Sequence, residues 1–563
     1  MDNRLTCHLL SQPSLAPEPL AIRDEYEAEA TNRLSQPEWK MSHRTLLVFI
    51  TICVLTLMVA LDSTSIGVAL PTISRALHSS GIETFWAGTG FLLCATVFQP
   101  NFVSFSTIFG RRSLFLVGIG FFFVGAVVAG VSKNVTQLLV GRCIQGVGGG
   151  GISAITEVLI ADLVPMRYRG QYYGLMNAMW SVGSVCGPII GGAFAGSASW
   201  RWIFYINFPF VGIGIVCVVV FMNLHFVPTS LSDKLRRIDY IGSVIFIGST
   251  TAFLIPLTWG GVVYSWHSWR TLVPLIIGSI GCGVFVVYEA YFAPAPIIPI
   301  NLFKNRTASV SFVSAGLSGL LVWCIVYYMP LYFQAVKEYS PVLTGVCIFP
   351  QTFTVAPAGA IAGIAITKTG KYRWAIWSGW ALATLGLGLL CILEVGTSVP
   401  GWIFLNLVSG IGLGFLFPSV ASAIQAATAP EHVPMALAMF SFFRSLGQAV
   451  GVAIGGVIFQ NRMTVNLLNY PNLAPNATAY GADAAGLVDI IKSMPDGQNK
   501  HDLQQAFVDS LRIVWAVCCA LAGFGLLLSL LNQSYSIDRE LVSSQGIVEK
   551  HHQLRPHAEG TGV

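Results

Sequence analysis

The residues of this chain that could do chemistry are charged side chains within long apolar stretches of sequence. Asp62, Arg142 and Arg444 lie well inside such stretches, and Glu157 lies toward the end of one. A charge at the middle of a bilayer costs at least about 2.5–3.5 kcal/mol, so an intramembrane ionisable group is by default a candidate for function. Side chains of these types can bind protons and hold a polar substrate.

Each candidate also has a purely structural interpretation. Asp62 and Arg142 fall at similar depths in their spans, so we expect both to face a central cavity. There Asp62 would contribute to proton or substrate binding, and Arg142 would shift the pKa of nearby acids. The alternative is a fixed structural ion pair. For Arg444, cavity lining and a helix-to-helix bond remain equally open. Glu157 and Glu289 lie near the inner ends of their spans, where snorkelling toward the interface is the simpler interpretation, but Glu157 remains a candidate for proton transfer.

The composition excludes a soluble globular protein. Of the 563 residues, 54% are hydrophobic and 10% are charged, whereas soluble domains contain about 25% charged residues. The net charge of +5 is small, which gives no reason to expect nucleic acid as a partner. Eleven of the twelve cysteines lie in apolar stretches and are expected to be packing residues. The sequence shows no ATP-binding loop and no intramembrane histidine cluster, so we expect no cofactor and no metal.

Apolar stretches long enough to cross a bilayer recur along the chain. A membrane-spanning helix needs about 20 apolar residues. The sequence predicts an all-α polytopic membrane protein with fourteen transmembrane helices, at residues 46–70, 85–106, 113–131, 137–159, 172–194, 204–226, 239–258, 272–293, 309–333, 343–366, 374–394, 401–425, 434–458 and 511–532.

The loop charges predict the orientation. Short loops on one side carry twelve Lys and Arg residues against five on the other, so the positive-inside rule places both termini in the cytoplasm. The polar segment 460–510 then lies outside, where the Asn476-Ala-Thr triplet is a candidate for glycosylation. The predicted organisation begins with a polar N-terminal tail (1–45) and a six-helix half (46–226). Two inserted helices with their loops (227–300) follow, then a second six-helix half that contains the 460–510 loop (301–535), and a C-terminal tail (536–563).

Internal repetition supports two related halves. Gly146 and Gly148 recur as Gly410 and Gly412, an offset of 264 residues. The same offset relates Gly183, Gly187, Gly191 and Gly192 to Gly447, Gly451, Gly455 and Gly456. A single glycine match would indicate only close helix packing. Several matches at one offset favour parallel repeats with a binding site at their interface, which is a transporter architecture.

These residues resemble the major facilitator superfamily, and within it the fourteen-span drug:proton antiporters, especially fungal efflux pumps for drugs, toxins or secondary metabolites. The resemblance rests on Leu61-Asp62-Ser-Thr64, Gly110-Arg111-Arg112, Gly141-Arg142 with Gln145-Gly146, and Trp200-Arg201-Trp202. The span-five element resembles the antiporter motif of exporters and consists of Gly183, Gly187, Pro188, Gly191 and Gly192. Its proline permits a bend, and its glycines permit a close helix contact.

One loop departs from the family pattern. The family's gating loop before Gly110-Arg111 usually contains an aspartate, but Thr107 occupies that position here. Asp162 is the nearby acid that could instead pair with Arg111 or Arg112. We expect this gating network to be weakened or rebuilt.

The resemblance implies a secondary active transporter that exports small organic molecules in exchange for protons, and not an enzyme. Its expected partners are the substrate, protons and the lipid bilayer, and its expected location is the plasma membrane, with the vacuolar membrane as the alternative. The alternative function is import or vacuolar loading of a nutrient or an iron chelate. A membrane enzyme or a receptor is disfavoured, since neither tail is long enough for a signalling domain.

Overall fold

The structure is a computed structural model that describes residues 41–79, 81–224, 230–260, 264–482 and 484–538. Most of the two predicted tails lies outside these residues. The contacts divide the chain into residues 1–46 and residues 47–563, and every contact discussed below lies within the second unit.

Helices make up nearly all of the described chain, and the described residues contain no β-strand. The first half contains α2 (His43–Leu77), α3 (Gly81–Phe109), α4 (Arg111–Gly130), α5 (Val135–Leu163), α6 (Met166–Ser197), α7 (Trp202–Tyr205) and α8 (Asn207–Phe221). Between the halves lie α9 (Leu231–Arg236), α10 (Tyr240–Trp259) and α11 (Trp269–Tyr291). The second half contains η1 (Ile300–Phe303), α12 (Arg306–Leu331), η2 (Tyr332–Val336), α13 (Pro341–Cys347), α14 (Phe349–Thr369), α15 (Arg373–Leu390), α16 (Val399–Ala427), η3 (Pro430–His432), α17 (Val433–Leu467), η4 (Ala474–Asn476), α18 (Ala477–Ala482), α19 (Ala484–Ser493) and α20 (Gln498–Ser529).

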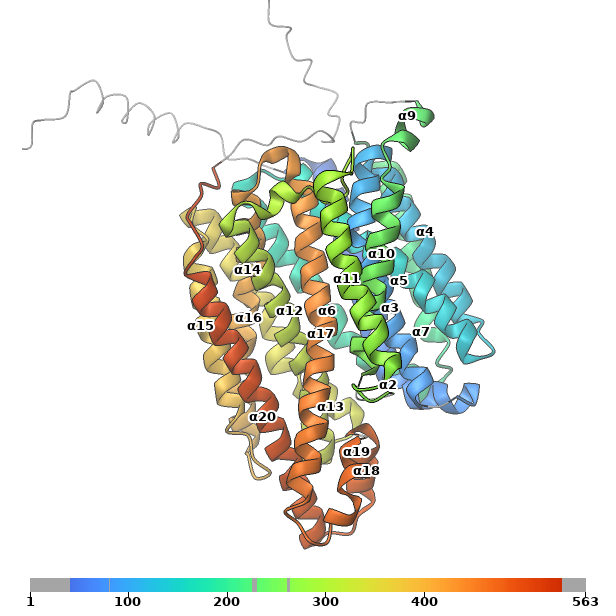
Figure 1. Ribbon diagram of the computed structural model, residues 1–563, viewed down its shortest axis with the longest axis vertical. Coiled ribbons are helices and arrows are strands. Elements are labelled where there is room, and N and C mark those ends of the chain that lie inside the picture. The colour runs from blue at the N-terminus through green and yellow to red at the C-terminus, as the bar shows by residue number, and fades with distance from the viewer. Residues whose placement is uncertain (1–40, 80, 225–229, 261–263, 483, 539–563) are drawn as a thin grey trace, which may run out of the picture. The chain divides into compact units, whose positions relative to one another are not determined.

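The long helices run side by side as a bundle, with α9 at one end and α18 and α19 at the other (Figure 1). Thirteen helices among the described residues are long and apolar enough to cross a membrane. The 18-residue helix α15 packs against α16 and α20 and supplies the fourteenth span. The predicted all-helical membrane bundle is confirmed.

Three predicted elements differ from the helices observed. The sixth span is divided into α7 and α8 because Pro209 cannot donate a hydrogen bond to the preceding turn. The tenth is divided into α13 and α14, and Pro350 lies in the first turn of α14. The predicted loop 460–510 is partly helical. Its last part begins α20, because Leu503, Phe507 and neighbouring apolar residues are buried.

The internal repeat reappears in the helix packing. In the first half, α5 packs between α3 and α4, and a Cβ atom on Gly146 would lie 3.0 Å from Cα of Phe91 on α3. In the second half, α16 packs between α14 and α15, and a Cβ atom on Gly410 would lie 2.6 Å from the carbonyl oxygen of Gln351 on α14. Glycines at matching positions therefore permit the same close approach in both halves.

Candidate functional site

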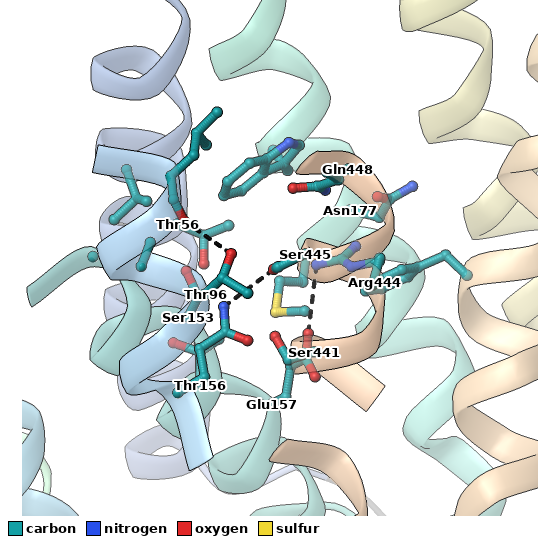
Figure 2. Close-up of a pocket in the computed structure, with 18 of the residues that line it drawn as sticks. Thr56, Thr96, Ser153, Thr156, Glu157, Asn177, Ser441, Arg444, Ser445 and Gln448 are labelled. Carbon is teal, nitrogen blue, oxygen red and sulfur yellow. Dashed lines mark hydrogen bonds and ion pairs between the residues drawn. The ribbon is translucent and has the colours of Figure 1, made fainter. Parts of the chain in front are cut away.

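A small cavity of about 60 Å³ lies between the two halves. Helices α2, α3, α5 and α6 of the first half and α16 and α17 of the second contribute to its walls. The polar side chains labelled in Figure 2 line it, and these are Thr56, Thr96, Ser153, Thr156, Glu157, Asn177, Ser441, Arg444, Ser445 and Gln448. Gln99 is a further polar lining residue. Apolar side chains complete the lining, among them Phe91, Met176, Trp180 and Phe417.

Glu157 and Arg444 are the two charged residues among those that line the cavity. They point toward each other from α5 and α17, and Oε1 of Glu157 lies 3.6 Å from a guanidinium nitrogen of Arg444 (Figure 2). The Glu157 side chain is 2% exposed and that of Arg444 is 23% exposed. Snorkelling of Glu157 toward the interface is therefore wrong, because its carboxylate turns inward to a cationic partner. Arg444 both lines the cavity and bonds another helix.

Aromatic rings support Arg444 from the second half. Its guanidinium carbon lies 4.6 Å from the ring centroid of Phe417 and 5.7 Å from that of Phe440. A cation over an aromatic face is stabilised by about 0.5–2 kcal/mol. These contacts fix the position of the positive charge beside the cavity.

A second polar contact crosses between the halves. Nε2 of Gln99 on α3 donates a hydrogen bond to Oγ of Ser445 on α17 at 3.2 Å. Gln99, Asn177, Ser441 and Gln448 were not singled out from the sequence. The available signal was the occurrence of isolated amide or hydroxyl side chains within otherwise apolar spans.

Asp62 and Arg142 form a closed cluster inside the first half and are not among the residues that line the cavity. Oδ2 of Asp62 lies 2.5 Å from a guanidinium nitrogen of Arg142, and both side chains are fully buried. Oδ1 of Asp62 accepts hydrogen bonds from Gln145 and Asn207, and Nε of Arg142 donates to the carbonyl oxygen of Ala87. The cluster thus joins α2, α3, α5 and α8. This geometry differs from the expectation that both residues face the cavity, and it matches the alternative of a structural ion pair.

The antiporter-motif glycines bring α6 against the part of α2 that carries Asp62. A Cβ atom on Gly183 would lie 2.6 Å from Cβ of Ala60, and one on Gly187 would overlap Oγ1 of Thr64. Gly191 contacts the backbone of Ser65, whereas Gly192 has more room, since its Cβ would lie 3.4 Å from Val68. Pro188 lies within α6 between these contacts.

The gating loop lies at the end of the bundle that we call the basic end, where helix ends, the short helix α9 and a loop carry Arg111, Arg167, Lys234 and Lys371. Gly110 precedes α4 with a φ of 94°, a conformation that favours glycine. Nε of Arg111 donates to Asp162 at 3.0 Å, and this pair is buried. The Arg112 guanidinium donates instead to Oδ1 of Asn223, just after α8, and to the carbonyl oxygen of Val219, within α8.

Close contacts between the halves lie between the cavity and the basic end. A guanidinium nitrogen of Arg169 on α6 donates to Oε1 of Gln425 on α16 at 2.7 Å. A Cβ atom on Gly174 of α6 would lie 2.7 Å from Cα of Ala360 on α14. Tyr173 lies in the same layer, where its hydroxyl donates to the carbonyl oxygen of Glu157. The halves are therefore tightly packed on this side of the cavity.

The remaining candidates lie away from the cavity. Glu289 on α11 is buried, and its carboxylate accepts hydrogen bonds from the backbone nitrogens of Ile297 and Ile298 in the segment that follows α11. Asn476 is exposed at the end of η4. Among the described residues, no group of three or more His, Cys, Asp or Glu side chains could hold a metal ion.

Residues 52–452 match the family model described as Major Facilitator Superfamily. The chain belongs to the major facilitator superfamily. The chain is therefore a multi-pass membrane transporter rather than an enzyme, and the predicted resemblance is confirmed.

Three relatives in this superfamily come from fungi. The chain is 51% identical over 535 residues to "MFS transporter L2" from a Phoma species, covering 95% of this chain and 89% of the relative. It is 39% identical over 518 residues to "MFS-type efflux pump LUC4" from a Fusarium species, covering 91% of each. It is 37% identical over 516 residues to the "Acurin A biosynthesis cluster MFS-type transporter" of Aspergillus aculeatus, covering 90% of this chain and 92% of the relative.

A solved structure shares the major facilitator fold. The crystal structure of the human organic anion transporter MFSD10 (TETRAN) aligns with a TM-score of 0.52 at 15% identity, and the match covers 88% of this chain and 100% of that one. The fourteen spans of this chain are two six-helix halves with α10 and α11 as the additional pair between them.

Proposed function

We propose that this major facilitator transporter exports small organic molecules in exchange for protons, and that the cavity between the halves is the binding site. The observation that carries the proposal is the Glu157–Arg444 pair, in which an acid of the first half meets a base of the second beside the cavity. A group that changes charge at this position alters the attraction between the halves as well as the binding of a substrate.

The proposed cycle uses Glu157 as the proton carrier. When the cavity faces outward, a proton binds the Glu157 carboxylate, weakens its attraction to Arg444 and releases the substrate. When the cavity faces inward, the proton leaves and the restored carboxylate binds the next substrate. The two halves rock about the cavity between these states.

The cavity must enlarge during this cycle. Its volume of about 60 Å³ has room for about two water molecules, at roughly 30 Å³ each. A drug-sized ligand needs roughly 300–1,000 Å³. The observed packing therefore corresponds to a contracted state, and a substrate enters or leaves when α6 and α16 separate from their neighbours in the opposite half.

Asp62 and Arg142 have a supporting role in this proposal. Their cluster positions α2 within the first half, and α2 is the surface on which Gly183 and Gly187 of α6 pack. The first half can then move as one body while α6 slides or bends at Pro188.

The export direction is supported by the span-five motif and by relatives named as efflux pumps. We propose the plasma membrane as the location, with the basic end in the cytoplasm. The alternatives are import of a nutrient or an iron chelate, and loading of the vacuole.

The test compares metabolites in the medium and in cell extracts of the native host with and without this protein. If the protein is an exporter, loss of the protein should make a compound disappear from the medium and accumulate in the cells. A compound left behind in the medium would instead establish import. A compound that stays in the cytosol with no change outside would establish vacuolar loading.

A further inference from the structure

Hydrogen-bonding capacity is left over around the Glu157–Arg444 pair. Among the described residues that line the cavity, Oε2 of Glu157 and Oε1 of Gln99 accept no hydrogen bond, and Nε of Arg444 and Nδ2 of Asn177 donate none. The hydroxyls of Thr156 and Ser441 are also without a hydrogen-bond partner. The 3.6 Å separation of the pair exceeds the usual hydrogen-bond range of about 2.7–3.2 Å. Two acceptors, two donors and two hydroxyls around the cavity therefore keep unused hydrogen-bonding capacity.

The charges of the cavity are already balanced. In the part of the chain that the structure describes, Glu157 and Arg444 are the only charged residues that line it, and they compensate each other. A cationic ligand bonded to Glu157 would leave Arg444 without its counter-ion, and an anionic ligand bonded to Arg444 would leave Glu157 without one. An uncompensated buried charge is costly, so the balanced pair favours a ligand with no net charge.

The remaining lining suits an apolar body attached to this polar end. Phe91 and Met176 come from the first half, Phe417 comes from the second, and Trp180 of α6 lies in the same wall. Apolar and aromatic walls with a few fixed polar groups are typical of small-molecule sites. The polar groups would orient the ligand, and the rings would bury its body.

We infer that the substrate is an uncharged amphipathic molecule in which a hydrogen-bond donor lies next to a carbonyl acceptor, as in a carboxamide, a lactam or a hydroxy ketone. The carbonyl oxygen accepts from Nε of Arg444 and Nδ2 of Asn177, and the adjacent N–H or O–H donates to Oε2 of Glu157. The inference rests on the proposed function, since it assigns the substrate class of the same cavity. It also explains how a proton competes with a neutral substrate, because a protonated Glu157 is a weaker hydrogen-bond acceptor than the carboxylate.

Four probes with one ring system test the substrate class in the purified full-length protein. The probes are 2-naphthamide, methyl 2-naphthoate, 2-naphthoate and 2-naphthylmethylammonium, and calorimetry measures their binding at neutral pH. The amide, which has both donor and acceptor, is expected to bind about tenfold or more tightly than each of the others. Wild-type protein that binds the anion, the cation or the ester as tightly as the amide overturns the inference.

Charge variants make the test specific to the pair. Glu157→Gln leaves the positive charge unbalanced, so the preference should shift to the naphthoate anion. Arg444→Gln should shift it to the ammonium, and the double variant should restore the preference for the amide. Arg512→Gln, which removes an arginine on α20 paired with Asp509 outside the cavity, should keep the wild-type order.

If Glu157→Gln and Arg444→Gln both rank the four probe affinities as the wild-type protein does, the inference is also overturned. The ranking in wild-type protein decides the question if a variant fails to fold. Export by the host does not depend on these probes, so loss of the ranking with intact export removes the substrate class and leaves the proposed function standing.

Discussion

Glu157 and Arg444 lie 3.6 Å apart although they belong to different halves of the molecule. Among the residues that the structure describes, this is the one ion pair beside the cavity that joins the two halves. Its strength depends on the protonation of Glu157, whereas the neighbouring Gln99–Ser445 bond does not. The pair is therefore suited to link proton binding to the separation of the halves.

Replacing a glycine of α6 by alanine should reduce stability only where the glycine packs tightly against another helix. Gly187→Ala places a Cβ atom against Thr64 and the Leu61 carbonyl oxygen, and overpacking of this kind costs about 1–3 kcal/mol. Thermal unfolding in detergent should show a lower midpoint. Gly196→Ala, on the same helix with no atom within 4 Å of its Cβ, should show no loss. Equal midpoints for the two variants would contradict the packing described for α2 and α6.

Asp62→Asn should act mainly on stability. The substitution leaves Arg142 as an uncompensated buried charge, and breaking a buried pair in this way costs about 3–5 kcal/mol. The expected result is a large fall in the unfolding midpoint and in the yield of folded protein. Asp233→Asn on the exposed helix α9 is the control. An Asp62→Asn protein with unchanged stability and no proton-driven flux would instead make Asp62 the coupling residue, as its sequence context first suggested.

Gly110 should be required for its backbone conformation. With a φ of 94° and a ψ of 142°, it occupies a region essentially restricted to glycine, and another residue there costs about 1–3 kcal/mol. Gly110→Ala should lower the unfolding midpoint and loosen the buried Arg111–Asp162 pair. Gly120→Ala, in α4 with open space around its Cβ, should retain the wild-type midpoint. A matching loss in both would point to a general effect of alanine rather than to strain.

Glycosylation tests the orientation of the bundle. Asn476 is exposed in the segment between α17 and α20, whereas the Asn-x-Thr triplet at Asn305 precedes α12 at the basic end. Protein from a eukaryotic host should shift in mobility after removal of N-linked glycans, and Asn476→Gln should reduce the shift. The exposed Asn134-Val-Thr triplet at the same end of the bundle accounts for any remainder. Asn305→Gln should leave the shift intact. A shift that depends on Asn305 would reverse the assigned orientation.

The sequence predicted the spans and the close helix contacts, because both depend on local residue properties. Apolar length located the spans and placed most of their ends within a few residues; the largest errors are at the end of α17 and the start of α20. Glycines at matching offsets marked the close approaches of α5 and α16. The segment 460–510 was less predictable. Its polar residues suggested an open loop, but the buried face of α20 begins there.

The sequence could not predict which charged residues point into the cavity. In a membrane protein, the lipid-exposed and packed faces of a helix are both apolar, so periodicity does not reveal which side of α2 or α5 borders a cavity. Asp62 and Glu157 therefore looked similar in sequence, yet Asp62 lies in a closed cluster and Glu157 lines the cavity. The partner of Arg444 belongs to the opposite half, and only the tertiary structure brings the two together.

The most direct test of the central claim uses liposomes that contain the purified transporter, a pH-sensitive dye inside, and the compound that the metabolite comparison identifies. Addition of that compound should drive proton movement with wild-type protein and with Glu289→Gln, whose acid lies outside the cavity. Glu157→Gln, whose neutral side chain resembles the protonated state that releases the substrate, should bind the compound more weakly and move no protons. Proton movement that persists undiminished in Glu157→Gln would contradict the account.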